Sequence, residues 1–218
     1  MRMFLMIIGL LLAINFAKAQ EYKLYPPVLK GKLSFEEVLA KRRSVREFKK
    51  SPLTLEEVSQ LLWAVQGITD PKRGLRTAPS AGALYPLEVY VVIGEVKDLP
   101  QGVYRYIPKE HKIQQVKSED VREKLAQAAL GQVWVKEAPV VICISAEFER
   151  TERKYGQRAW RYVYLEAGHA AQNILLQAVA LGLGGVPVGA FNDGEVQQIL
   201  SLPEKHLPIY LIPVGRCF

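Results

Sequence analysis

The stretch Lys41-Arg42-Arg43-Ser44-Val45-Arg46-Glu47-Phe48 sets three arginines and one hydroxyl group together where a helical pattern ends. That helix is predicted to begin at Ser34, because a serine and the glutamate three residues later can cap each other's backbone amides. Guanidinium groups bind phosphate oxygens in pairs, and a serine hydroxyl can add one more donor. A solvated basic helix end, favoured by the helix dipole, has the same composition. On its own the stretch is more typical of such a surface, so the rest of the chain must decide.

Helical and extended patterns mix along the chain without strict βαβ alternation, which indicates an α+β fold. The first helix is expected to bury Phe35, Val38 and Leu39 on one face. The apolar run 139–145 is expected to lie in the centre of a sheet. Further strands are predicted at 88–94, 103–107, 113–116 and 207–214, and further helices at 54–66, 120–130 and 157–181.

The N-terminus carries one positive charge, a short apolar core and the small-residue pattern Ala17-Lys18-Ala19. This combination predicts a cleaved secretory signal over residues 1–19, with a retained membrane anchor as the alternative. We therefore expect an exported protein, periplasmic or secreted. Residues 20–33 are expected to form an N-terminal extension and residues 34–218 one domain, since no linker or repeat divides them.

The charge balance is moderately basic: the formal charge is +7, and loss of Arg2 and Lys18 with the signal would leave +5. This balance suits an anionic or phosphate-bearing ligand and is too weak and dispersed to predict nucleic-acid binding. Cys143 in an apolar run and Cys217 near the end predict a buried thiol and a tail thiol, with a disulfide as the open alternative. There is no CxxC motif or histidine cluster, so no metal site is expected.

The long helix predicted at 157–181 carries a polar stripe, because Glu166, His169, Asn173 and Gln177 recur at spacings of three and four. A buried polar stripe must be hydrogen-bonded and would border a ligand or an interface. The wet side of an amphipathic helix is the alternative interpretation.

Two segments are rich in small residues, which allow a flat ligand to approach the backbone. They are the loop Pro79-Ser80-Ala81-Gly82-Ala83-Leu84-Tyr85-Pro86 and the run from Gly184 to Phe191. The chain ends in Pro213-Val214-Gly215-Arg216, whose arginine could meet Arg42 and Ser44 at one phosphate.

Taken in order, these motifs resemble the nitroreductase superfamily of flavin enzymes over nearly all of the mature sequence. The resemblance is greatest to the SagB-type dehydrogenase branch, which includes the azoline oxidases of thiazole- and oxazole-containing peptide maturation. It implies a nitroreductase-like fold with a central, mostly antiparallel β-sheet wrapped by helices, in a homodimer of intertwined domains. The motifs that carry it are Arg42-Arg43-Ser44, the Pro79–Pro86 loop, Gly102–Tyr106, Lys154–Arg158, Leu165–His169 and Val214-Gly215-Arg216.

The resemblance also implies FMN, bound between the two subunits. On that pattern Arg42, Ser44 and Arg216 contact the phosphate and ribityl chain, with Arg43 and Arg46 nearby. Each charge-assisted hydrogen bond would contribute roughly 1.5 to 3 kcal/mol. The resemblance further places Pro79, Ser80, Ala81 and Gly82 along the flavin ring and gives N5 a backbone amide from Gly189 or Ala190.

Lys154 and Tyr155 match the Lys-Tyr pair of azoline dehydrogenases and are the candidates for proton chemistry. Oxidation of a C–N or C–C single bond needs a base for one hydrogen while the flavin takes the other as hydride. A buried lysine can be that base near neutral pH, because burial disfavours its charged form. A surface lysine beside a packing tyrosine is the alternative. Ala83 stands where many nitroreductases carry asparagine, which fits the SagB-type branch and argues against simple nitroreductase activity.

We therefore expect an FMN-dependent oxidoreductase that transfers hydride between a small organic substrate and N5 of FMN. NADH and NADPH are intracellular, so an exported enzyme is expected to take its electrons from the substrate itself. Oxygen, a quinone or a redox protein would then reoxidise the flavin. An NAD(P)H-dependent nitro or quinone reductase and a non-catalytic flavin-binding protein are the alternatives.

Overall fold

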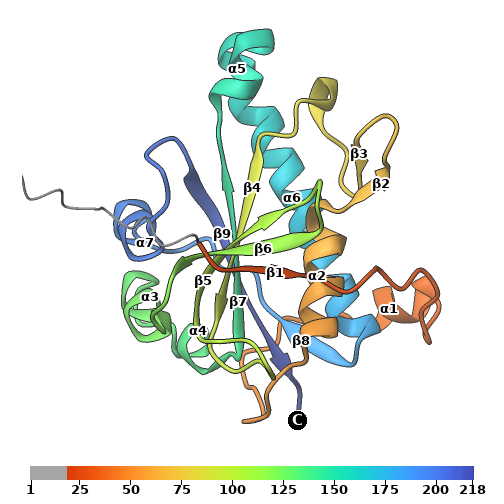
Figure 1. Cartoon of the computed structure of the whole chain (residues 1–218), viewed down its shortest axis with the longest axis vertical. Helices are drawn as coiled ribbons and strands as arrows, with labels where there is room; N and C mark the ends of the chain where they lie inside the picture. The colour runs from red at the N-terminus through yellow and green to blue at the C-terminus, as the bar shows by residue number, and fades with distance from the viewer. Residues whose placement is uncertain (1–18) are drawn as a thin grey trace, which may run out of the picture.

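The computed structural model describes residues 19–218 and shows a central seven-stranded sheet with the strand order β1-β6-β5-β4-β7-β9-β8 (Figure 1). All neighbouring strands in this sheet pair antiparallel. Strand β7 (Val140–Ala146) lies between β4 (Leu87–Ile93) and β9 (Leu207–Arg216). The predicted α+β class, the antiparallel sheet and the central position of the run 139–145 are thus confirmed.

Helices cover both faces of the sheet (Figure 1). The remaining strands are β1 (Glu21–Lys23), β5 (Gly102–Ile107), β6 (Lys112–Lys117) and β8 (Leu183–Gly185), and β2 (Ile68–Asp70) and β3 (Leu75–Arg76) form a separate two-stranded sheet. The α-helices are α1 (Phe35–Lys41), α2 (Leu55–Gln66), α3 (Arg122–Ala128), α4 (Val133–Glu137), α5 (Glu149–Tyr155), α6 (Ala159–Ala180) and α7 (Asp193–Ile199). Within the expected N-terminal extension, β1 pairs with β6 and adds a strand to the edge of the sheet.

Side chains of β7 alternate between two hydrophobic cores, one on each face of the sheet. Ile142 and Ile144 pack into the core that includes α2 and α6. Val141 and Cys143 pack into the opposite core, which includes α3, α4 and α7. A strand buried on both faces has no polar side, which explains the continuous apolar run in the sequence.

The capping box predicted at Ser34 is present at the start of α1, and Thr54 and Glu57 form a second one at the start of α2. The expected burial of α1 is confirmed only for Val38, because Phe35 and Leu39 are 63% and 45% exposed. Helix α1 lies at the edge of the molecule (Figure 1), where no second layer covers its outer side. The periodic pattern therefore predicted the helix correctly but predicted more buried side chains than the structure shows.

The signal sequence and its possible anchor role lie outside the described residues, except for Ala19. From residue 19 onward, none of the helices is both long and apolar enough to cross a membrane. Cys143 is buried in β7, and burial raises the pKa of its thiol to about 12. Cys143 and Cys217 are both free thiols, so the disulfide alternative is not formed in this structure.

Candidate functional site

The basic segment, residues 42–49, lies against the last two strands of the sheet. Ser44 forms a parallel bridge with Gly185 of β8, and the Val45 amide donates to the Gly185 carbonyl oxygen at 3.1 Å. Farther along, the Lys49 amide donates to the carbonyl oxygen of Arg216 at 2.9 Å. These bonds bring the first and last motifs of the chain to the same edge of the sheet.

Two glycines allow this close approach. A Cβ atom at Gly184 would lie 2.5 Å from Cys217 Sγ and 2.6 Å from Val45 Cγ2. A Cβ atom at Gly215 would lie 2.8 Å from the ring of Phe48. Real Cβ atoms do not approach other atoms this closely, so glycine at both positions keeps the basic segment flat on the sheet.

The side chains of Arg42 and Ser44 make no hydrogen bond or ion pair with any described residue, and Ser44 is exposed. Arg216 is held in place by Glu57 of α2, whose Oε2 accepts from Arg216 Nη2 at 3.0 Å. Two donors, one of them charged, are therefore free to bind an anion, and Arg216 of β9 adds a second positive charge.

The other two arginines of the basic segment are directed elsewhere. Arg43 Nη1 donates to the carbonyl oxygens of Ala40 and Arg42, at 3.0 and 2.8 Å. The Arg46 guanidinium carbon lies 5.4 Å from the ring centroid of Trp134 in α4. Both guanidinium groups already contact other parts of the chain. The expected position of Arg43 and Arg46 near a phosphate stays a prediction.

The run that follows β8 offers free backbone donors. Val188 and Leu211 exchange backbone hydrogen bonds of 2.8 and 3.0 Å, which tie the run to β9. The next two residues, Gly189 and Ala190, are exposed, and neither amide donates a hydrogen bond to a described residue. The Ala190 carbonyl oxygen accepts from Gln132 Nε2 at 2.9 Å, which holds the peptide that follows these two amides.

The Pro79–Pro86 loop is held in a strained conformation. Gly82, Ala83 and Tyr85 have φ angles of 62°, 54° and 48°, in the left-handed region that residues other than glycine rarely adopt. The Tyr85 amide donates to Ser80 Oγ at 2.9 Å and closes the loop. Strained backbone of this kind clusters at functional sites, where the surrounding structure enforces it.

The predicted proton-transfer pair contacts this loop directly. A Cβ atom at Gly82 would lie 2.9 Å from both Lys154 Nζ and Tyr155 Oη. Helix α5, which carries both residues, projects beyond the end of the sheet (Figure 1), so Lys154 is exposed rather than buried in this chain. Tyr155 is fixed by an edge-to-face contact with Tyr162, with ring centroids 5.0 Å apart.

Arg150 on α5 joins the helix, the loop and the sheet, an arrangement that sequence reasoning missed. Its guanidinium group pairs with Glu88 of β4, contacts Glu147 at 2.6 Å and donates to the Tyr85 carbonyl oxygen at 3.0 Å. Burial by itself raises the pKa of Glu88, but Arg105 and Arg150 outweigh it and hold that pKa below its usual value. A glutamate inside an otherwise apolar strand was the available signal.

The same cluster contains the one potential set of metal ligands among residues 19–218. Donor atoms of Glu88, Glu147 and His206 lie within 4.8 Å of one another. However, the Arg150 guanidinium already bridges the two carboxylates, and His206 Nδ1 lies 2.7 Å from the hydroxyl of Tyr90. The position that a cation would take is filled by a side chain of the protein itself.

The polar stripe on α6 is divided between buried and exposed positions. Gln177 accepts from Gln60 at 3.1 Å, and Asn173 donates to a backbone carbonyl oxygen at 3.4 Å. His169 is exposed, as the amphipathic alternative allows. Glu166 is only 3% exposed, and burial raises its pKa to about 7. The stripe therefore borders the Pro79–Pro86 loop at Glu166, whose pKa is influenced by the hydroxyl of Ser80.

The loop and strand β8, on which the basic segment lies, meet α6 at different positions along the helix. Ser80 lies near Glu166, whereas a Cβ atom at Gly185 of β8 would lie 3.6 Å from Leu175 Cδ2. The interval from Glu166 to Leu175 corresponds to about 14 Å at roughly 1.5 Å per residue of helix. Within one chain, the two predicted halves of the site are thus separated along the helix axis.

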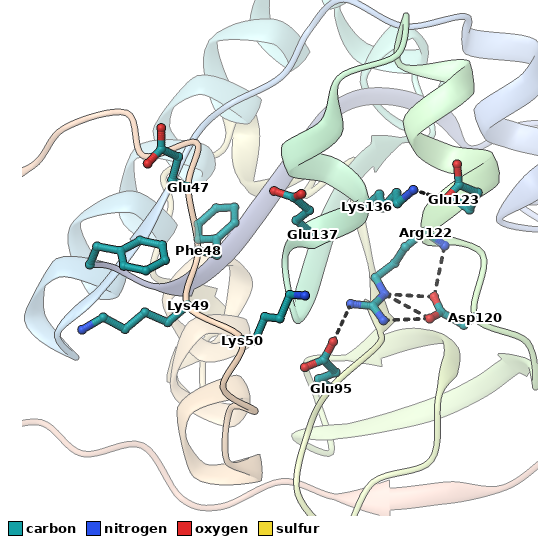
Figure 2. A pocket seen from close by; sticks show the side chains of 11 residues that line it. Glu47, Phe48, Lys49, Lys50, Glu95, Asp120, Arg122, Glu123, Lys136 and Glu137 are labelled. Carbon is teal, nitrogen blue, oxygen red and sulfur yellow. Dashed lines mark hydrogen bonds and ion pairs between the residues drawn. The ribbon is translucent and has the colours of Figure 1, made fainter.

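A hollow of about 910 Å³ is lined on one side by Glu47, Phe48 and Lys49 at the end of the basic segment (Figure 2). Most of its charged groups pair with one another: Arg122 contacts Asp120 at 2.8 Å and Glu95 at 3.6 Å, and Lys136 contacts Glu123 at 2.7 Å. The remaining charged groups, Glu47, Lys49, Lys50 and Glu137, also carry both signs, so the lining does not form a matched anion site.

Comparison with known proteins connects these features to one family. The model described as "Nitroreductase family" matches residues 39–216. The nitroreductase-like protein MJ1384 of Methanocaldococcus jannaschii is 52% identical over 184 residues, which cover 84% of this chain and 91% of that protein. The solved structure of a nitroreductase-like protein from Ralstonia eutropha has a TM-score of 0.80 at 30% identity and covers 91% of this chain and 90% of its own.

Two more distant relatives have informative names. The microcin B17-processing protein McbC of Escherichia coli is 27% identical over 72% of this chain and 59% of McbC. The NAD(P)H FMN reductase of Bacillus subtilis is 26% identical over 82% of this chain and 64% of that enzyme. The family match across most of the chain and the high identity to MJ1384 show that this protein belongs to the nitroreductase family.

Proposed function

We propose that this protein is an FMN-dependent oxidoreductase of the SagB-type branch, which transfers hydride between a small organic substrate and N5 of FMN. The observation that carries the proposal is the convergence of Lys154 and Tyr155 on Gly82, in the loop expected to line the flavin ring. The relationship to the microcin-processing protein McbC supports the branch, and the relationship to an FMN reductase supports the cofactor.

The donor groups of the chain fit FMN. Arg42 and Ser44 have free side chains for the phosphate, and each charge-assisted bond would contribute roughly 1.5 to 3 kcal/mol. The free, exposed amides of Gly189 and Ala190 can donate to the ring edge. Arg216, already oriented by Glu57, adds positive charge near the phosphate.

We propose a homodimer in which FMN lies between the loop of one protomer and the basic segment of its partner. The separation of these two halves along α6 supports this arrangement. Trp160, Tyr164 and Leu165 of α6 are 43%, 50% and 55% exposed, and Phe35 of α1 is 63% exposed. A partner that covers these side chains would remove their apolar surface from water.

Bound FMN would supply the hydride chemistry. Lys154 Nζ and Tyr155 Oη, both beside Gly82, would take or give the substrate proton. Arg150 would keep this pair against the loop through the Tyr85 carbonyl oxygen. A protomer that covers α5 would also exclude water from the site around Lys154.

Export, proposed from the predicted signal over residues 1–19, determines the electron source. An exported enzyme would take electrons from its organic substrate and return them to oxygen, a quinone or a redox protein. The alternative is an NAD(P)H-dependent nitro or quinone reductase, favoured by the name of the Bacillus subtilis relative.

Spectroscopy of the purified protein tests the proposal. We expect a flavin absorption spectrum, or tight binding of added FMN, and no bleaching by NADH or NADPH under anaerobic conditions. A protein that is colourless and does not bind added FMN contradicts the proposal. Bleaching by NAD(P)H supports the reductase alternative, and a bound flavin that no donor or acceptor changes indicates a non-catalytic flavin-binding protein.

A further inference from the structure

Three buried polar atoms beneath the Pro79–Pro86 loop lack hydrogen-bond partners among the described residues. They are Gln66 Nε2 at the end of α2, Arg76 Nε in β3 and Glu166 Oε1 in α6. Gln66 is fully buried, and Glu166 is 3% exposed. Buried polar atoms nearly always have partners, so this group of atoms from separate elements requires an explanation.

The contacts around Glu166 link it to the loop. Arg76 Nη1 donates to Gln66 Oε1 at 2.7 Å, and the Arg76 guanidinium carbon lies 4.5 Å from the ring centroid of Tyr85. Ser80 Oγ accepts the Tyr85 amide hydrogen at 2.9 Å, which leaves the hydroxyl hydrogen of Ser80 free to be donated. The Ser80 hydroxyl and the Gln66 amide lie near Glu166 and lower its pKa, although neither forms a hydrogen bond of good geometry with its carboxyl group in this structure.

The surroundings of Glu166 allow it to change charge near neutral pH. Burial raises the pKa of Glu166 to about 7, and Ser80, Arg76 and Gln66 offset this rise only in part. Arg76 is the charged group that acts on Glu166 from β3, while Gln66 of α2 and Ser80 of the loop are uncharged. Arg76 also faces Glu88, but Arg105 and Arg150 already pair with that carboxylate.

We propose that Glu166 is an internal proton donor and acceptor for the loop, and that it exchanges its proton through the hydroxyl group of Ser80. The inference rests on the proposed function, in which this loop lines the flavin ring. A hydride brings FMN two electrons and one proton, so the reduced ring would need one more proton to be neutral. Glu166 would supply this proton and become a carboxylate: the Ser80 hydroxyl would give its hydrogen to the ring edge and take the hydrogen of Glu166. The proton returns by the same path on reoxidation, and no electrons move through either residue.

Infrared spectroscopy of the ligand-free protein tests the acid–base part. We expect the carbonyl band of a buried carboxylic acid to titrate near pH 7, as the pKa of about 7 requires. Glu166→Gln should remove this band. Glu149→Gln is the matched control, because the Glu149 side chain is 66% exposed, and it should leave the band unchanged. A band that persists in the Glu166→Gln variant, or is absent from the wild type at mildly acidic pH, overturns the proposal.

Difference spectra of the FMN-loaded protein test the transfer itself. Reduction of bound FMN by dithionite should remove the Glu166 band in the wild type. The loss should be absent in Ser80→Ala and restored in Ser80→Thr, which keeps the hydroxyl group and controls for disturbance of the loop. Failure to bind FMN overturns the proposed function and the donor role together. FMN that binds and is reduced with no change in the band overturns the donor role alone.

Discussion

Arg150 Nη1 donates a hydrogen bond to the Tyr85 carbonyl oxygen at 3.0 Å and so connects helix α5 to the loop expected to line the flavin ring. The same guanidinium group pairs with the buried carboxylates of Glu88 and Glu147. One side chain thereby fixes the distance between the sheet, the loop and the helix that carries Lys154 and Tyr155. The proton-transfer pair depends on this residue for its position.

Arg150→Ala should destabilise the protein, because two buried carboxylates lose their shared partner and keep only Arg105 and Lys205. Removal of the sole partner of a buried charge costs about 3 to 5 kcal/mol in free energy of unfolding, so the loss here should fall below that range. Urea unfolding measures the change. Arg153→Ala is the control on the same helix: its side chain is 77% exposed and its pair with Glu149 is 3.8 Å long. Equal stability of the two variants would show that Arg150 is not an anchor.

Gly82→Ala should slow substrate oxidation even at saturating FMN, and because Gly82 is expected to line the flavin ring it should also lower FMN affinity. The new Cβ atom would lie 2.9 Å from Lys154 Nζ and Tyr155 Oη and would displace both. Gly131→Ala is the matched control, because Gly131 also has a positive φ, 75°, but nothing lies within 4 Å of its Cβ position. Turnover and FMN titration separate the two effects. Equal turnover in the two variants would remove the role of this contact.

Arg42→Ala should weaken FMN binding roughly 10- to 100-fold, the loss expected for one charge-assisted hydrogen bond. The double variant Arg42→Ala/Arg216→Ala should lose more, because both groups are expected at the phosphate. Arg73→Ala removes the same charge at a pair with Asp70 away from the basic segment and should leave the affinity unchanged. Fluorescence titration with FMN provides the dissociation constants, and wild-type affinity in the double variant would disprove the phosphate assignment.

Glu166→Gln should change how stability depends on pH. The pKa of Glu166 is about 7 in the folded protein and lies near the ordinary value of 4.5 in the unfolded chain. Between these two pKa values Glu166 is deprotonated in the unfolded chain and still protonated in the folded protein. The free energy of unfolding of the wild type therefore falls as pH rises from about 4.5 to about 7. The full loss is on the order of 3 kcal/mol above pH 7.

Glutamine does not titrate, so the stability of Glu166→Gln relative to the wild type should be greater at about pH 8 than at about pH 5. Glu88 has a lowered pKa and acts in the opposite direction, but it is common to both proteins and cancels in the comparison. Urea unfolding at the two pH values is the measurement. A stability difference that is the same at both would refute the raised pKa.

Local patterns were sufficient for much of the fold. The capping boxes at Ser34 and Thr54 depend on residues three positions apart, and both are present. Strands β5, β6 and β7 were predicted at 103–107, 113–116 and 139–145, and all three are present. The exposure of Phe35 did not follow, because helical spacing does not show whether a neighbouring layer covers the helix.

Local sequence patterns predicted less of the candidate site than of the fold. The family motifs identified the loop and the basic segment, but Glu88 and Arg150 are 62 positions apart and their pairing is visible only in the folded chain. Glu166 could be placed on a polar stripe, yet its burial and the lack of a partner for Oε1 depend on α2, β3 and the loop together.

The sequence by itself determined the helix starts, the main strands and the motifs of the nitroreductase family, because these depend on residue type and short-range spacing. Only the tertiary structure decided that Gly82 meets Lys154 and Tyr155, and that Glu166 lies buried beneath the same loop. A side chain becomes buried or paired with a charge only when segments that are distant in the sequence pack against it. This packing sets the pKa of a residue such as Glu166, and hence its chemistry.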